Sequence, residues 1–371
     1  MSGASASAAR PKMGARPPSP SRDWRRLRFI PLAAGAGAFA IGIWVGLMRL
    51  GLTLPGGGTL AASHSALMIS GFLGTVITLE RAVAIGTSWA YAAPALSALA
   101  AIALVAGDAN AAAVLFLLAG ILLTFNSAFI VVRQPALFTV LLMVAAACWV
   151  TGTLAGMQGA SPGAISGWWL TFLILTIVAE RLELSRLLLP PRFSQWTFVL
   201  AIVLILAGGI RSELGGPSAT VSGLGLLAVT AWLIRYDIAM RTIRFAGLAR
   251  FSAVCILTGY FWLMVAGLLL LTAPPGALAF SYDAIVHAIA IGFVLSMILG
   301  HAPIILPAVT RLKVRYHAAA YLPLALLHLS VLLRVAADLV GHVDLRAVSG
   351  PLTVLAFVAY AATLIIASRR S

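Results

Sequence analysis

Three histidines, His64, His287 and His328, lie inside apolar stretches that are long enough to cross a membrane. Because an imidazole is costly to place in hydrocarbon, a histidine inside a membrane is a candidate for a functional site. Imidazole nitrogens are ligands for haem iron and for copper, and they also carry protons. The chemistry that these residues suggest is therefore haem or metal binding, or proton movement within the bilayer.

The elements that must position these side chains are membrane-spanning helices. Apolar residues make up 61% of the 371 residues and charged residues only 9%, whereas soluble domains carry about 25% charged residues. Apolar runs recur at lengths that match a hydrocarbon core of about 30 Å. The sequence predicts an all-α, polytopic membrane helix bundle of about 12 transmembrane helices in the lipid bilayer, near 29–50, 60–82, 89–107, 111–132, 136–156, 165–188, 196–210, 218–240, 251–273, 280–300, 317–338 and 347–367.

The net charge of +15 follows from the topology that the spans predict. With both termini in the cytoplasm, 21 of the 25 Lys and Arg residues fall on the cytoplasmic side, as the positive-inside rule requires. Only Arg49, Arg211, Arg334 and Arg346 remain for the outer side. Insertion in a bacterial inner membrane explains the basic residues, so we expect no nucleic-acid partner.

The chain divides into two parts. Residues 1–28 are rich in Ser, Ala, Pro and Arg, which predicts a disordered basic cytoplasmic tail. Residues 29–371 form a single transmembrane helical domain whose short loops leave no room for a soluble one. No phosphate-binding glycine loop or nucleophile elbow is present, so the sequence points to no known enzyme class. Cys148 and Cys255 lie in separate spans and are expected to be small buried side chains.

Two of the histidines share a depth. The second and tenth spans both run inward, so His64 lies about 6 Å and His287 about 10 Å below the outer surface. Two imidazoles at one level can hold a haem iron from opposite faces. His328 lies about 15 Å below the outer end of its span, where it would hold copper or line a proton path. The alternative for each is an ordinary hydrogen bond to a neighbouring helix.

Charged residues near the outer surface fit a haem site. Asp283 is one helical turn before His287, so its carboxylate is expected to hold the second ring nitrogen. Arg49 and Arg334 lie at the outer ends of the first and eleventh spans, where they would bind haem propionates. These three residues complete the predicted cofactor site.

A second group of polar residues lies near the cytoplasmic ends of the spans. Glu80, Glu180 and Glu183 stand beside arginines, which predicts boundary ion pairs or an entry route for protons. His301 is about 21 Å along the helix from His287, so the two cannot share one metal.

The chain resembles subunit I of haem-copper oxidases in having twelve spans with one histidine that opens the second span and another in the tenth. In that family the low-spin haem is held between these two helices. The resemblance stops at the binuclear centre. The sixth span has no histidine, the seventh has no His-His pair, and the tenth has no His-x-His. Oxygen reduction is therefore not expected.

A closer resemblance is to the NnrS family, bacterial membrane proteins with haem and copper that are linked to nitric oxide stress. The segment from His64 through Met68 to Phe72 is similar to a His-x-x-x-Met-x-x-Gly-Phe motif of that family, and His287 to His301 is similar to its late His-x-x-x-x-Gly to Gly-His stretch. Ala-Pro follows His301 where that family would continue differently. The resemblance implies that His64, His287 and His301 are haem or metal ligands, with haem b and copper as the cofactors.

Two other functions compete with haem binding. A proton-coupled secondary transporter would use His64, His287, Glu80 and Glu180 as proton or substrate sites, although we find no paired broken helices in corresponding halves. A scaffold without any site of its own would leave the two histidines at matched depth unexplained.

Overall fold

The computed structural model describes residues 28–56, 58–188, 191–213, 218–310 and 316–369. Within these ranges every regular element is a helix, and 12 helices are long and apolar enough to cross a membrane. This confirms the predicted all-α membrane bundle. The spanning elements are α2 (Phe29–Arg49), η2 with α3 (Ala66–Gly74, Thr75–Ile85), α4 (Ala92–Val105), α5 (Ala109–Arg133), α6 (Leu137–Met157), α7 (Pro162–Ser185), α8 (Arg192–Glu213), α9 (Ala219–Tyr236), α11 (Gly247–Thr272), α12 with η5 and α13 (Ser281–His287, Ala288–Leu295, Ser296–Thr310), α14 (Tyr321–Val340) and α15 (Val343–Arg369).

Two predicted boundaries are wrong. The tenth span was expected to end at residue 300, but α13 continues to Thr310 through Pro303 and Pro307. Proline is tolerated in membrane helices because neighbouring groups take up the freed backbone hydrogen bonds. The second span was expected to begin near residue 60, but residues Gly58–Ser63 form the 3₁₀ helix η1, and the apolar span begins at Ala66.

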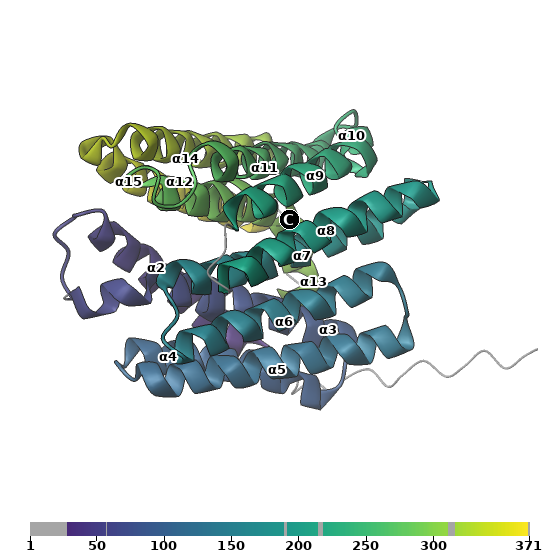
Figure 1. Ribbon diagram of the computed structural model, residues 1–371, viewed down its shortest axis with the longest axis horizontal. Helices are drawn as coiled ribbons and strands as arrows, with labels where there is room; N and C mark the ends of the chain where they lie inside the picture. Colours follow the sequence, from purple (N-terminus) through teal and green to yellow (C-terminus); the bar gives the residue numbers. More distant parts are fainter. Residues whose placement is uncertain (1–27, 57, 189–190, 214–217, 311–315, 370–371) are drawn as a thin grey trace, which may run out of the picture.

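Consecutive helices pack as antiparallel neighbours. The main contacts join α4 to α5, α5 to α6, α6 to α7, α8 to α9, α9 to α11, and α14 to α15. Figure 1 shows α4, α5 and α6 along one side of the bundle and α9, α11, α14 and α15 along the other. Helices α7 and α8 lie between these groups (Figure 1). Short connections at both ends leave the polar side chains inside the bundle as the place for a site.

Two spans contain a π-helical segment at equivalent places. Segment η2 begins two residues after His64, and segment η5 begins directly after His287. Each has a glycine against a tryptophan ring: a Cβ at Gly74 would lie 2.9 Å from Trp149, and a Cβ on Gly292 of η5 would lie 2.3 Å from a Trp ring of α11. π segments are rare and gather at functional sites, and each predicted haem ligand lies one or two residues before such a segment.

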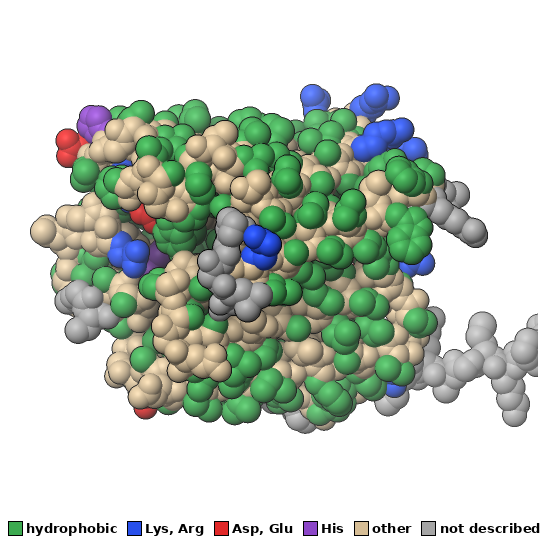
Figure 2. Space-filling model, in the orientation of Figure 1, with side chains coloured by type: hydrophobic (Ala, Val, Ile, Leu, Met, Phe, Trp, Pro, Cys, Tyr) green, Lys and Arg blue, Asp and Glu red, His purple; other side chains and the backbone are tan. Residues whose placement is uncertain are grey.

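The basic side chains gather at one end of the molecule. Figure 2 shows Lys and Arg mainly at the end that carries the short helix α10 (Ala239–Thr242), and acidic residues and His mainly at the opposite end. Apolar side chains cover the surface between the two ends (Figure 2). This is the distribution that a helix bundle in a bilayer requires. The predicted tail of residues 1–28 lies, except for Arg28, outside the described residues.

Candidate functional site

The His64 ring is held by the first span. Its Nδ1 lies 2.8 Å from the carbonyl oxygen of Gly42, and a Cβ at Gly46 would lie only 2.8 Å from the ring. Gly46 thus leaves the space that the imidazole occupies, whereas Gly42, one turn earlier on α2, leaves space for Met68. Although His64 lies just before the apolar span, its ring reaches the level of Gly42, about 10 Å along α2 from its Arg49 end.

His287 is fixed in the same way by its own helix. Its Nδ1 lies 2.7 Å from the backbone oxygen of Asp283. We expected the carboxylate of Asp283 to hold the ring, and this is wrong: that carboxylate binds two arginines instead. A carbonyl oxygen only accepts hydrogen bonds, so Nδ1 carries the proton in both neutral rings, and each Nε2 keeps its lone pair.

His287 lies within electrostatic range of His64. His287 interacts electrostatically with His64 and with Arg334, and His64 interacts with Arg49, Arg334 and Asp283. Neither Nε2 has a hydrogen-bond partner among the described residues. Neither belongs to the buried polar atoms that lack a partner, so both Nε2 atoms border accessible space. Two free lone pairs near one another are what axial ligation of a haem iron needs.

An ion-pair network lies beside the two rings. Asp283 Oδ2 is 2.5 Å from Arg346 and 3.5 Å from Arg334. Arg334 also donates to the carboxylate of Asp338 at 3.0 Å, and Arg346 donates to the second oxygen of the same group. The Arg346 guanidinium lies 3.6 Å from the centre of the Phe280 ring. Two arginines and two carboxylates compensate each other, which is the arrangement that makes buried charges tolerable.

The two arginines predicted to bind propionates differ in their surroundings. Arg334 is buried, and its Nε and one terminal nitrogen are already bound to Asp338 and Asp283. Arg49 is exposed and donates to the carbonyl oxygen of Ala61 at 3.4 Å. Arg49 is therefore the better placed of the two for an added carboxylate.

His328 and His301 lie apart from this pair, and both of their ring nitrogens are engaged. Trp262 donates to Nδ1 of His328 at 3.0 Å, and the opposite nitrogen lies 3.3 Å from Ser296. Ser296 is about 13 Å along the helix from His287. Arg181 donates to Nε2 of His301 at 2.9 Å, while Nδ1 bonds its own helix. As placed, neither histidine offers a lone pair to a metal.

The polar groups near the basic end form one part-buried ion pair and one buried hydrogen-bonded group. Arg81 and Glu180 are 2.7 Å apart, so the Glu-Arg ends of the second and sixth spans meet. Asp237 is buried, accepts from Tyr260 at 3.0 Å and from a backbone nitrogen, and its pKa is raised by burial. The boundary ion pairs that we predicted are thus present for one of the three glutamates.

The cysteines and the groups of acidic residues and histidines bear on whether a metal ion could be held. The described residues contain no group of three or more His, Cys, Asp or Glu side chains that could hold a metal ion. Cys148 and Cys255 are both buried and free, as expected. Two imidazole nitrogens without a hydrogen-bond partner are the donor type that haem iron takes, whereas the described residues contain no three-residue group of the kind that holds copper.

The sequence missed several residues that build this site. The pair Gly42 and Gly46 has a visible signal, because two small residues one turn apart allow another chain to approach closely. Asp338 and Arg346 flank an outer loop, and nothing in their spacing indicates that they meet Asp283.

Comparisons with known proteins give one match. The sequence model of a family described as "Domain of unknown function (DUF8744)" matches residues 26–369. No curated protein matches. No solved structure matches either.

Proposed function

For this chain, which belongs to the domain-of-unknown-function family DUF8744, we propose a role as a haem-binding protein of the bacterial inner membrane. Haem b is held between the second and tenth spans, with His64 and His287 as the axial ligands. The observation that carries the proposal is the hydrogen bonding of the two imidazole rings, which fixes their tautomer. Each donates its Nδ1 proton to a backbone carbonyl, and each keeps Nε2 free for iron.

The surroundings of the pair support the same assignment. A hydrogen bond from the ring nitrogen that faces away from the iron fixes the tautomer and the orientation of a ligating imidazole. The Gly42 and Asp283 carbonyls provide these bonds, and Arg49 remains available for a propionate. Haem b, when bound, supplies a one-electron couple.

The proposed role is redox sensing or protection against nitric oxide, in line with the resemblance to the NnrS family. We do not include copper in the proposal, since both nitrogens of His301 and of His328 are already engaged. Oxygen reduction is not included either, because the described residues around the pair offer no second group of ligands.

A proton-coupled secondary transporter is the second candidate, and one observation favours it. Transport sites often lie where helices are interrupted at corresponding positions of two halves of a protein. The π segments η2 and η5 interrupt the regular α-helix of the second and tenth spans, each beside a histidine, although these two spans do not occupy corresponding places in two six-span halves. In this function, the two imidazoles would carry protons instead of iron.

One experiment separates the two functions. The full-length protein and its His64→Ala and His287→Ala variants are purified from haem-replete cells, and reduced-minus-oxidised absorption spectra are recorded. We expect a haem b spectrum in the wild type and its loss in both variants. The variant His342→Ala, which changes an exposed histidine outside the site, should keep the spectrum.

A colourless wild type would overturn the haem proposal and leave transport as the function to assay. A haem spectrum that survives in both histidine variants would place the cofactor elsewhere and equally contradict the assignment.

A further inference from the structure

A pocket lies at the basic end of the bundle, far in sequence from the histidine pair. It has a volume of about 430 Å³, within the range of roughly 300–1,000 Å³ typical of small-molecule sites. It forms where α11 and α14 begin. Its lining residues are Ala246, Gly247, Arg250, Val254, Tyr316 and Tyr321.

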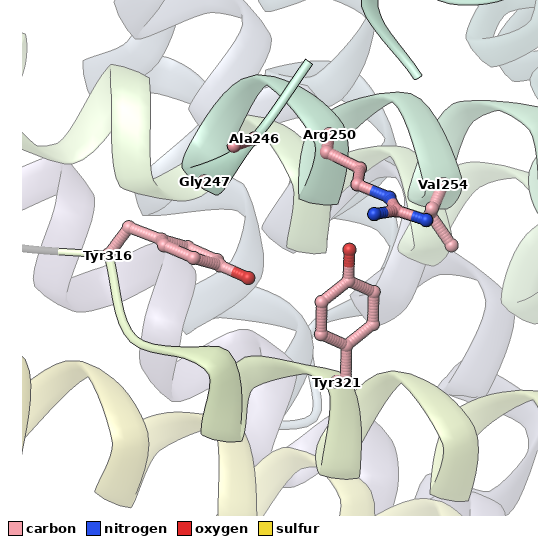
Figure 3. Close-up of a pocket in the computed structure, with 6 residues that line it drawn as sticks. All are labelled: Ala246, Gly247, Arg250, Val254, Tyr316 and Tyr321. Atoms are coloured by element: carbon pink, nitrogen blue, oxygen red, sulfur yellow. The ribbon is translucent and has the colours of Figure 1, made fainter. Parts of the chain in front are cut away.

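Three polar groups from two parts of the chain converge on this pocket. Figure 3 shows the guanidinium of Arg250 and the hydroxyl groups of Tyr316 and Tyr321 directed towards a common space. Guanidinium and phenol groups are hydrogen-bond donors, and an arginine binds oxyanions through two nitrogens at once. Donors that approach from several sides suit a tetrahedral oxyanion better than a flat carboxylate.

The electrostatics of the pocket favour an anion. The ion pairs among the described residues involve other arginines, and Arg250 is in none of them. Asp237, the acidic residue nearest to Arg250 in the sequence, is occupied by Tyr260 and a backbone nitrogen. Arg241 is exposed on the preceding segment and adds positive charge.

The Tyr316 and Tyr321 hydroxyl groups are hydrogen-bonded to each other beside Arg250. Burial raises the pKa of Tyr316 from its ordinary value near 10, and the neighbouring Tyr321 raises it further. Tyr316 therefore keeps its proton under physiological conditions. A neutral donor beside Arg250 adds hydrogen bonds without adding charge.

The position of the pocket indicates where the anion comes from. The pocket lies at the ends of two membrane spans, which is the level of lipid headgroups. Residues beside the lining positions expose large apolar side chains: Phe245 is 60% exposed and Leu322 is 61% exposed. An amphiphile can therefore place its charged group in the pocket and its acyl chains along the apolar surface.

We propose that this pocket binds the phosphate of an anionic phospholipid headgroup, through Arg250, Tyr316 and Tyr321. Basic pockets between transmembrane helices are known to bind such headgroups. The lipid would join the start of α11 to the start of α14. The proposal does not depend on haem binding: the lipid titration can succeed or fail whatever the absorption spectrum shows.

The test is a lipid titration of the purified full-length protein in detergent, followed by native mass spectrometry. Phosphatidylglycerol and phosphatidylcholine are compared, and the phosphatidylglycerol series is repeated with inorganic phosphate as competitor. We expect tighter binding of phosphatidylglycerol, weakened about tenfold by Arg250→Gln, since a charge-assisted hydrogen bond is lost. Tyr316→Phe and Tyr321→Phe, which remove only a hydroxyl, should each weaken binding about threefold.

Arg244→Gln is the matched control, because Arg244 is exposed in the same region but does not line the pocket. It should change the dissociation constant by less than about twofold. Equal effects of Arg244→Gln and Arg250→Gln would refute the site. Equal affinity for the two lipids, or displacement of phosphatidylglycerol by millimolar inorganic phosphate, would refute a lipid as its ligand. The two phenylalanine variants keep the test decisive if Arg250→Gln does not fold.

Discussion

The imidazoles of His64 and His287 are each held by a backbone carbonyl oxygen, without help from a carboxylate. A helix carbonyl one turn away, or on a packed neighbour, is an acceptor that does not titrate. The imidazoles can thus keep the same tautomer while the nearby ion pairs change. His328 is the contrasting case, because Trp262 donates to its Nδ1 and the proton must lie on Nε2.

At the residue scale, we predict that Gly46→Ala displaces the His64 ring. The added Cβ would lie 2.8 Å from the imidazole, and the ring cannot move without straining its bond to Gly42. Overpacking of this kind costs about 1–3 kcal/mol. The free energy of unfolding, measured by denaturant titration of the purified protein, should fall by that amount.

Gly37→Ala is the control on the same helix, since its Cβ would meet nothing within 4 Å. Alanine is favoured over glycine within a helix by about 0.5–1 kcal/mol, so this variant should be as stable as the wild type or more stable. If Gly46→Ala proves as stable as Gly37→Ala, the packing of His64 on α2 is not as described here.

At the element scale, the site depends on three helices that the ion-pair network ties together. Asp283 belongs to α12, Arg334 and Asp338 belong to α14, and Arg346 belongs to α15. Since His287 is bonded to the backbone of Asp283, a shift of α12 would move the ligand itself. The network is thus a positioning device for the tenth span.

We predict that Asp338→Asn destabilises the protein strongly. The Asp338 side chain is fully buried between two arginines, and removing one charge of a buried group leaves the others uncompensated at a cost of about 3–5 kcal/mol. Asp344→Asn, at an exposed position of the same turn region, should cost less than about 1 kcal/mol. Denaturant unfolding of the two variants measures both values, and a difference below about 1 kcal/mol would show that the network carries little stability.

The sequence predicted the number of spans well, but it did not predict the π segments inside the second and tenth spans. Apolar length is a strong signal in a bilayer, so the number of spans agrees with the structure. The π segments after His64 and His287 were not predicted, because they arise when helices pack closely, as Gly74 does on Trp149. The contact between Gly74 and Trp149 cannot be predicted from the hydrophobic pattern of either helix.

At the scale of the whole molecule, depth along each span could be read from the sequence, whereas rotation about each span could not. For example, the position of His301 fourteen residues after His287 in one span indicated that these two histidines lie at different depths. The pairing of Asp283 with Arg346 depends instead on which faces of α12 and α15 meet. Composition fixes membrane insertion, but only packing decides which polar groups share a site.

The orientation of the bundle in the membrane is the last prediction, and it concerns the whole molecule. Twelve crossings bring residues 29 and 369 to the same side, and the gathering of arginines at the α10 end places that side in the cytoplasm.

Gln134 and Gln158 flank the two ends of α6, and both are exposed. We predict that a membrane-impermeant maleimide labels Gln158→Cys in intact cells, and labels Gln134→Cys only after the cells are permeabilised. The native Cys148 and Cys255 are buried and give little background. The reverse labelling pattern would invert the topology and place the histidine pair in the inner half of the membrane.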